Sequence, residues 1–203
     1  MKQLTDFINV HQGSTVVHAT DETLNDIVKE ELNKFGRSVD LNYIDVSKVT
    51  IMKGTFADTN IDYDVKGDEL NIDISKWDVH NVKVFESTFE YSKFNGDISE
   101  WDVSNGVDFH SMFFQCHWFN CDVSKWDMRK AENISYMFYG CYEFNQDLSN
   151  WKTPNLLKMN KAFFNCYKLK SDFSSWDVSN LKSYDEYIFY ATKLPKNKLP
   201  KFK

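Results

Sequence analysis

The chain has 203 residues, enough for one ordinary domain or two small ones. Its 24 lysine and arginine residues against 30 aspartate and glutamate residues give a net charge of −6. This balance disfavours a nucleic-acid partner, because such proteins usually show a basic patch or stripe. No apolar run reaches the ~20 residues that cross a bilayer, so we expect no membrane insertion.

Residues 1–36 show no internal repeat and predict a terminal cap. The segment Thr15–Ala19 suits a short strand, and a helix is expected from an N-cap at Thr20 or Asp21 to Gly36. Its apolar stripe consists of Leu24, Ile27, Val28, Leu32 and Phe35. A stack of repeats needs an end with one polar face. We therefore interpret 1–36 as an N-terminal cap, with an independent ligand-binding module as the alternative.

Six copies of one pattern follow the cap. Five of the six tryptophans stand 24, 25, 25 and 25 residues apart, at Trp77, Trp101, Trp126, Trp151 and Trp176. The surrounding sequence repeats, for example as FNGDISEWDVSN from Phe94 and FNCDVSKWDMRK from Phe119. We place the starts of the units at residues 37, 70, 94, 119, 144 and 169, with an insertion around 60–69 in the first unit. This period is typical of solenoids, in which stacked neighbours bury the apolar face of each unit.

The pattern within a unit predicts its local structure. The apolar positions of the first half suit a short, kinked extended segment. In the second half, residues such as Ile134, Met137 and Phe138 follow the spacing of one helical turn. The sequence therefore predicts an α/β fold, a leucine-rich-repeat-type solenoid over 37–192 with one short strand and one short helical turn per repeat.

The last segment, 193–203, is a basic C-terminal tail with five lysines and no acid. Residues 1–192 consequently carry a net charge of −11. One hypothesis is a solvated tail that ends the stack at Pro195. The other is a segment that binds an anionic partner or folds back on the acidic body.

The motif FNxDISxWDVSN, followed by MFYGC at Met137–Cys141, resembles the BspA-like repeat of bacterial surface proteins, and the match covers about 37–193. The resemblance implies a curved α/β solenoid used for adhesion or protein binding, without enzymatic activity. Secreted members of that family carry export signals, whereas the start of this chain lacks the apolar run of a secretory signal. Similar repeats also occur in chains without such signals, some encoded by bacteriophages. We therefore expect a cytoplasmic or virion-associated location rather than the cell surface.

An aspartate occupies the same position of every unit. The row comprises Asp40, Asp73, Asp97, Asp122, Asp147 and Asp172. Stacked carboxylates repel one another, so each must accept hydrogen bonds from turn N–H groups or the following serine, or bind a cation such as calcium. The chain lacks the glycine-rich nonapeptide of calcium-binding β-rolls, so we expect the structural use and assign no metal.

Cysteines give a second candidate site. Three of them share one position of the repeat, namely Cys116, Cys141 and Cys166, and predict a buried column of small apolar side chains. Cys121 lies outside this position and, with Cys116, His110 and His117, places four zinc-ligand side chains within 12 residues. This spacing fits no zinc pattern. We expect free thiols and no metal or other cofactor.

Signatures of catalysis are missing from the sequence. The motifs GxxxxGK[ST], GxGxxG, HExxH and GxSxG do not occur. The five histidines are scattered through the cap and two repeats, and they suggest no nucleophile–base pair. We therefore expect that the protein is not an enzyme.

The positions that vary between units are where a repeat protein places recognition. One row, predicted to face outward, reads Tyr43, Lys76, Glu100, Lys125, Asn150 and Ser175. A second row near the predicted helical turn is aromatic and comprises Phe114, Trp118, Tyr139, Tyr142, Phe164, Tyr167, Phe189 and Tyr190. Exposed tyrosine and tryptophan suit an interface, although some of these rings can instead fill gaps between coils.

These observations predict a non-enzymatic scaffold that recognises a macromolecular partner, most simply a protein, through its variable face. We select as partner-binding residues Trp118, Tyr139, Tyr142, Tyr167, Lys76, Glu100, Lys125 and Asn150. The alternatives are a structural or virion-associated component and an inhibitor that occludes a host protein. The sequence leaves the oligomeric state open.

Overall fold

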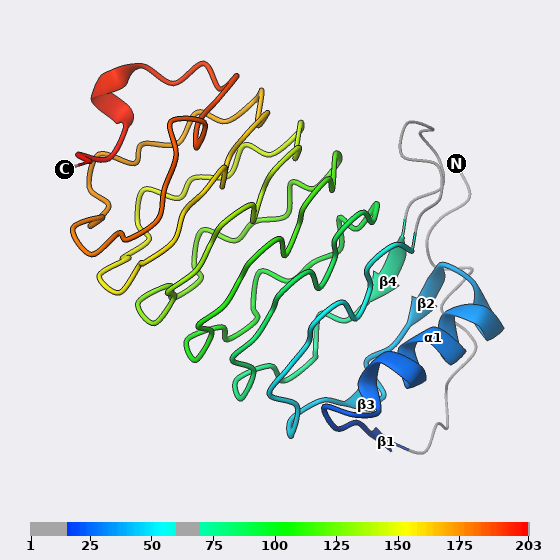
Figure 1. Cartoon of the computed structure of the whole chain (residues 1–203). Coiled ribbons are helices and arrows are strands. Elements are labelled where there is room, and N and C mark those ends of the chain that lie inside the picture. Colours follow the sequence, from blue (N-terminus) through cyan, green and yellow to red (C-terminus); the bar gives the residue numbers. More distant parts are fainter. Residues whose placement is uncertain (1–15, 60–69, 203) are drawn as a thin grey trace.

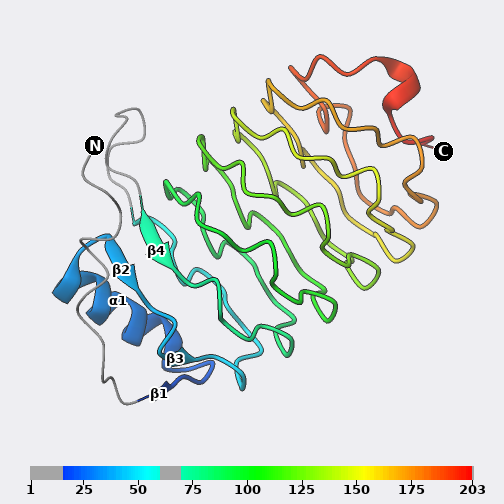
Figure 2. The same ribbon diagram turned by 180° about the vertical axis from the view of Figure 1, so that it is seen from behind.

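The repeated apolar residues face one continuous core. In the computed structural model, which describes residues 16–59 and 70–202, the chain winds into coils that lie side by side along one axis (Figures 1 and 2). The first 15 residues of the predicted cap, the insertion 60–69 and Lys203 lie outside the described residues. One column of the core consists of fully buried phenylalanines, at Phe56, Phe89, Phe113, Phe138 and Phe163. Neighbouring rings of this column stack at 5.3–5.5 Å between centroids.

Parallel strand pairing joins the first coils. Strand β1 (Val17–His18) pairs with β3 (Ile44–Asp45), and β2 (Ser38–Asp40) pairs with β4 (Asn71–Asp73). Further along, single parallel bridges link the same position of successive coils, from Ile51 through Val84, Asp108, Asn133 and Lys158 to Ser183. The sequence predicts a strand in every repeat, but the described coils after β4 have no regular strand. Adjacent coils share isolated bridges instead.

The segments in which we expected a helical turn are runs of overlapping β-turns. We call residues 85–92, 109–116, 134–141 and 159–166 the turn segments. Some N–H groups of these segments donate to a carbonyl three residues back, as the N–H of Ser92 does to Phe89 at 3.0 Å. Others donate to a carbonyl of the next coil, as the N–H of Phe89 does to Met112 at 2.9 Å. A helix would keep its N–H groups within one coil. In the turns, some N–H groups bond within their own coil and others bond to the next coil. Stacking favours the turns because they supply hydrogen bonds between coils.

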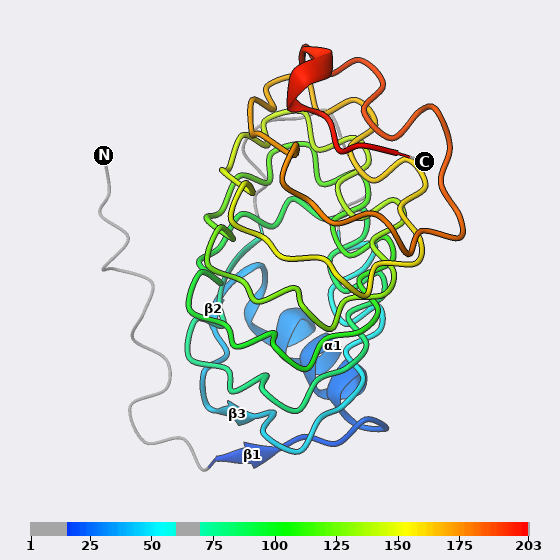
Figure 3. The same cartoon turned by 90° about the vertical axis from the view of Figure 1, so that its left-hand side faces the viewer.

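Helix α1 (Leu24–Phe35) covers the N-terminal end of the core. Figure 3 views the stack from its C-terminal side, and α1 lies behind the coils. Gly36 follows the helix as the C-cap, with a φ of 77° that favours glycine. The N-cap is Thr23 rather than the predicted Thr20 or Asp21. Asp21 is used elsewhere, because its carboxylate accepts hydrogen bonds from the N–H and hydroxyl of Thr50 at 2.6 Å each. That contact fastens the helix to the first coil.

The basic tail lies on the last coil. A short 3₁₀ helix, η2 (Lys196–Lys198), stands at the opposite end of the stack from α1 (Figure 1). The N–H of Phe173 donates to the carbonyl of Lys198 at 2.8 Å, and the Nζ of Lys198 donates to the carbonyl of Lys170 at 2.9 Å. The ring of Phe202 stacks on Tyr184 at 5.1 Å. The structure thus favours the hypothesis in which the tail folds back.

Candidate interaction surface

The aspartate row closes six identical turns. In each coil, the N–H two residues further on donates to Oδ1 of the aspartate at 2.8–3.0 Å. The hydroxyl and the N–H of Ser124 lower the pKa of Asp122, and Ser174 lowers the pKa of Asp172 in the same way. These carboxylates therefore serve the turns, the structural use that the sequence suggested. Within residues 16–59 and 70–202, no three histidine, cysteine or acidic side chains gather as a metal site would require.

The four cysteines each contact a different backbone group. The thiols of the column donate to a phenylalanine carbonyl of the preceding coil, Cys116 to Phe89 at 2.8 Å and both Cys141 and Cys166 to theirs at 3.1 Å. Burial raises the pKa of Cys116 to about 12. Cys121 lies half-buried and accepts a contact from the N–H of Ile98 at 3.4 Å. Each thiol is thus engaged within the stack.

The predicted polar row is exposed but loosely held. Lys76, Glu100, Lys125 and Asn150 are all exposed. They lie in a β-turn, which the N–H of Trp101 closes on the carbonyl of Ile98 in the third coil, and not in a strand. Lys125 contacts Glu100 at 2.9 Å, with both side chains more than two-thirds exposed. A pair this exposed contributes little to stability, so the row offers charges without a fixed shape.

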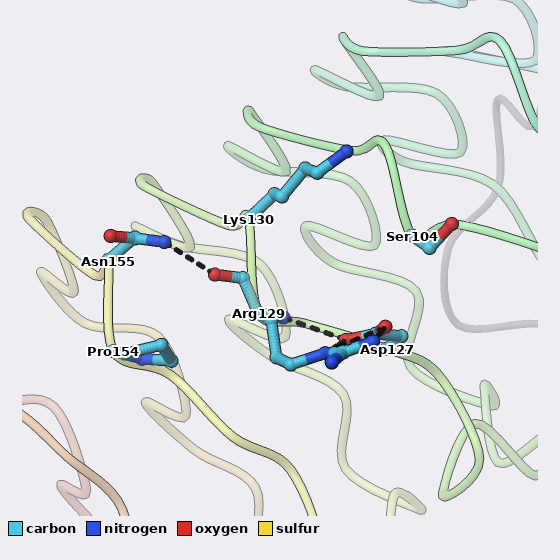
Figure 4. Close-up of a pocket in the computed structure, with 6 residues that line it drawn as sticks. All are labelled: Ser104, Asp127, Arg129, Lys130, Pro154 and Asn155. Atoms are coloured by element: carbon cyan, nitrogen blue, oxygen red, sulfur yellow. Dashed lines mark hydrogen bonds and ion pairs between the residues drawn. The ribbon is translucent and has the colours of Figure 1, made fainter.

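A shallow hollow of about 390 Å³ is lined by residues of three successive coils (Figure 4). Its lining residues are Ser104, Asp127, Arg129, Lys130, Pro154 and Asn155. The guanidinium of Arg129 is paired with Asp127, and the Nζ of Lys130 donates to Asn105 at 2.6 Å. The amide of Asn155 donates to the carbonyl of Arg129 at 2.8 Å. The charges of Asp127 and Arg129 are thus paired with each other, and Lys130 and Asn155 hold hydrogen bonds within the stack.

Three rows of aromatic side chains run along the turn segments, and we call them together the aromatic face. Row one consists of Tyr91, Phe114, Tyr139, Phe164 and Tyr190, with centroids 4.7–5.2 Å apart. Row two consists of His117, Tyr142 and Tyr167, at 4.2 and 5.1 Å. Row three consists of His110, Tyr136, Lys161 and Tyr187, in which the Lys161 ammonium lies 5.9 and 6.0 Å from the two tyrosine rings. These side chains lie outside the buried phenylalanine column and are half-buried or exposed.

Two of the predicted aromatic residues do not belong to these rows. Phe189 stacks on Phe163 at 5.3 Å and so extends the buried phenylalanine column. Trp118 is half-buried, and its Nε1 finds no hydrogen-bond acceptor among the described residues. The predicted Tyr139, Tyr142 and Tyr167 do lie on the aromatic face.

Row three is not among the residues predicted from the repeat pattern. Its members stand 26, 25 and 26 residues apart. The small shift in register and the change of residue type hide the row, although a search that tolerated one residue of slippage would find it.

A glycine shapes the centre of the face. Gly140 has a φ of 74°, and a Cβ there would lie 2.5 Å from Oε1 of Gln115. The side chain of Gln115 occupies this space and contacts Nε2 of His117 at 2.8 Å. His117 in turn stacks on Tyr142. The missing side chain at Gly140 therefore positions row two.

Comparison with known proteins places the repeat in a family. The model described as "Mycoplasma protein of unknown function, DUF285" matches three overlapping stretches, 23–113, 60–166 and 89–202. Overlapping matches of this kind are expected of a repeat. No curated protein and no solved structure matches the chain. Over the described ranges, no helix has the length and apolar character needed to traverse a bilayer.

Proposed function

We propose, from the premise that the chain belongs to the DUF285 repeat family of unknown function, that it is a non-enzymatic scaffold that binds another protein through the aromatic face. The observation that carries this proposal is the presence of eleven aromatic or imidazole side chains in three surface rows outside the core. Tyrosine-rich surfaces are typical of protein interfaces, because a rigid ring supplies apolar area and a hydroxyl together.

The organisation of the face supports binding without a large ordering cost. Neighbouring rings pack against one another, so their rotamers are restricted before a partner arrives, and preorganisation of this kind favours affinity. The backbone beneath them is held by hydrogen bonds between coils, such as Gln115 to Tyr139 at 2.7 Å. The BspA-like resemblance of the repeat, which implies adhesion or protein binding, points the same way.

The absence of enzymatic activity is also a proposal. The hollow near Arg129 joins charged side chains that are already paired or hydrogen-bonded within the stack, and the buried thiols have their pKa raised, which disfavours the nucleophilic thiolate. A structural or virion-associated component, or an inhibitor that occludes a host protein, would use the same face. These roles differ in the partner, which is a second copy, a virion protein or a host enzyme.

The proposal is tested by comparing two variants in affinity capture from host extract. Tyr139→Ala with Tyr142→Ser removes rings from rows one and two, whereas Lys125→Ser with Glu100→Ser removes two side chains of the polar row. We expect the wild type and the polar-row variant to retain one specific protein. The amount retained by the aromatic variant should be at least tenfold lower. If only the polar-row variant failed to retain the partner, the binding site would lie on the polar row. Self-association of the pure chain in light scattering would favour the structural role.

A further inference from the structure

An asparagine recurs along the stack and links neighbouring coils. In four coils its side-chain amide donates to a main-chain carbonyl of the preceding coil, at 2.7–2.8 Å. These residues, which we call the asparagine row, are Asn81, Asn105, Asn155 and Asn180. The acceptors also share one position of the repeat and are the carbonyls of Ser47, His80, Arg129 and Pro154. The row is thus a repeated hydrogen bond between coils.

The asparagine row is interrupted at Lys130, which stands 25 residues from Asn105 and 25 from Asn155. Its Nζ donates to Oδ1 of Asn105 at 2.6 Å and so does not replace the amide. The carbonyl of Ser104, which an asparagine in place of Lys130 would reach, receives no hydrogen bond from residues 16–59 and 70–202. The hollow of about 390 Å³ lies at this interruption, since Ser104 and Lys130 both line it (Figure 4). The stack therefore leaves an acceptor open beside a cavity.

The charges around the hollow balance. Its lining comes from three coils, of which we count residues 100–108, 125–133 and 150–158. They contain five acidic and five basic residues. The flanking coils, at 76–84 and 175–183, add two acidic residues, three basic residues and one histidine. Charge therefore selects neither an anion nor a cation for this site.

The groups at the hollow can bind a donor and an acceptor together. Asp127 is already paired with Arg129, whose hydrogen bonds, with the charge of Lys130 at longer range, lower the pKa of that carboxyl. The Lys130 ammonium has three donors, of which the bond to Asn105 uses one. An anion would offer no donor to the Ser104 carbonyl, and a cation would be repelled by Lys130. A neutral group that carries both N–H and C=O fits this pair.

We propose that the hollow binds the side-chain amide of an asparagine or glutamine of another protein. Its N–H donates to the Ser104 carbonyl, as the amides of the asparagine row do in other coils, and its oxygen accepts from the Lys130 ammonium. The bound side chain thereby completes the row. None of the residues that line the hollow belongs to the aromatic face, so the inference goes beyond the proposed function and does not depend on it.

The test is an NMR titration of the full chain that follows the ¹³C shift of the Ser104 carbonyl. The probes are the N-acetyl methylamides of glutamine, glutamate, lysine and alanine, which share one backbone and differ in the side chain. We expect the glutamine probe to move the Ser104 signal downfield, as a new hydrogen bond does, and the other three to leave it in place. Lys130→Met removes one donor to the probe and should weaken glutamine binding about 2–10-fold, the effect of one hydrogen bond.

Lys130→Asn supplies the missing amide from the chain itself. We expect its Ser104 carbonyl signal to lie downfield without any probe, and the glutamine probe to have no further effect. Lys125→Asn, which removes an exposed charge of the same coil, is the matched control and should bind the glutamine probe as the wild type does. A response to any other probe equal to that of glutamine, or undiminished binding by Lys130→Asn, would overturn the inference.

Discussion

Each tryptophan of the repeat both fills the core and joins two coils. Its indole is buried, and its Nε1 donates to an apolar residue's carbonyl in the preceding coil at 2.9–3.2 Å in all five cases. Phenylalanine would fill much of the same volume but would lose this hydrogen bond between coils. This explains why the row holds tryptophan, a fact that apolar periodicity alone does not account for.

Trp126→Phe should therefore lower the free energy of unfolding by about 1 kcal/mol, the net contribution of one hydrogen bond, because the carbonyl that loses the indole donor still accepts the N–H of Trp101. The lost bond is that of Nε1 to the Ile98 carbonyl, at 3.2 Å. Trp118→Phe is the matched control, because the indole N–H of Trp118 has no acceptor within the described part of the chain. Urea unfolding of both variants measures the difference. Equal losses would show that volume, and not the hydrogen bond, decides the residue.

The aspartate turns make stability sensitive to acid. Their N–H and hydroxyl donors lower the pKa of Asp102, Asp122, Asp147 and Asp172. The pKa of Asp45 is lowered to about 2, first by the hydroxyl of Ser47. A carboxyl whose pKa is lower in the folded state stabilises it above the unfolded value, near ~3.9, and loses this effect as the pH falls through the folded value. Stability should thus fall between about pH 4 and pH 2.

Thermal unfolding across this pH range measures the effect. Asp122→Asn offers the control, since asparagine retains an acceptor oxygen for the turn but does not titrate. We expect this variant to show a shallower acid dependence than the wild type. If the stability of both proteins depended on pH in the same way, Asp122 would contribute nothing to the loss of stability in acid.

At the scale of the element, the turn segments show where prediction from sequence stops. Left-handed backbone recurs four residues apart in each of these segments, for example at Ser87 and Tyr91 and at Tyr136 and Gly140. Glycine alone would signal such conformations, but here serine, tyrosine, glutamine, lysine and asparagine adopt them. The three-to-four spacing of apolar residues, common to a helix and to these turns, could not separate the two.

Gly140→Ala tests the turn geometry. The added Cβ would be strained at a φ of 74° and would collide with the Gln115 side chain. Gly54→Ala isolates the first effect, because its φ is 66° and the nearest atom to a Cβ there is the Ala57 Cβ at 4.0 Å. We expect a loss of about 1 kcal/mol for Gly54→Ala, in line with the left-handed penalty, and a larger loss for Gly140→Ala. Chemical denaturation of both gives the comparison, which losses of the same size would contradict.

At the scale of the whole molecule, stacking decided what the sequence could predict. The period, the unit boundaries and the inward rows follow from identical residues recurring every 24–25 positions, because each coil repeats its neighbour's environment. The aromatic face was predicted in part, and the predicted residues that belong to it are Phe114, Tyr139, Tyr142, Phe164, Tyr167 and Tyr190. Row three and the role of Phe189 were not, since which ring fills a gap between coils depends on slippage between units. The order in space of side chains such as Lys161 and Tyr187 emerges only from the packed coils.

The two ends of the stack also differ from its middle, because a terminal coil has one neighbour and needs cover on its other side. At the C-terminal end, that cover is the tail. Beyond its two hydrogen bonds to the last coil, it packs the partly buried Leu194 and Phe202 against the core. Removal of the tail would expose this apolar end and a strand-like edge, which invites pairing with another copy.

Truncation after Thr192 should therefore lower the free energy of unfolding by about 2–3 kcal/mol, the order expected from uncovering two or three half-buried apolar side chains. It should also produce concentration-dependent association in light scattering. Lys196→Ala with Lys201→Ala is the control, because it removes two exposed charges while the cover stays in place. If the double variant associates as strongly as the truncated chain, then charge and not cover keeps the end of the stack from self-association. Hydrogen exchange near Trp176, faster in the truncated chain and unchanged near Trp101, would locate the loss in the last coil.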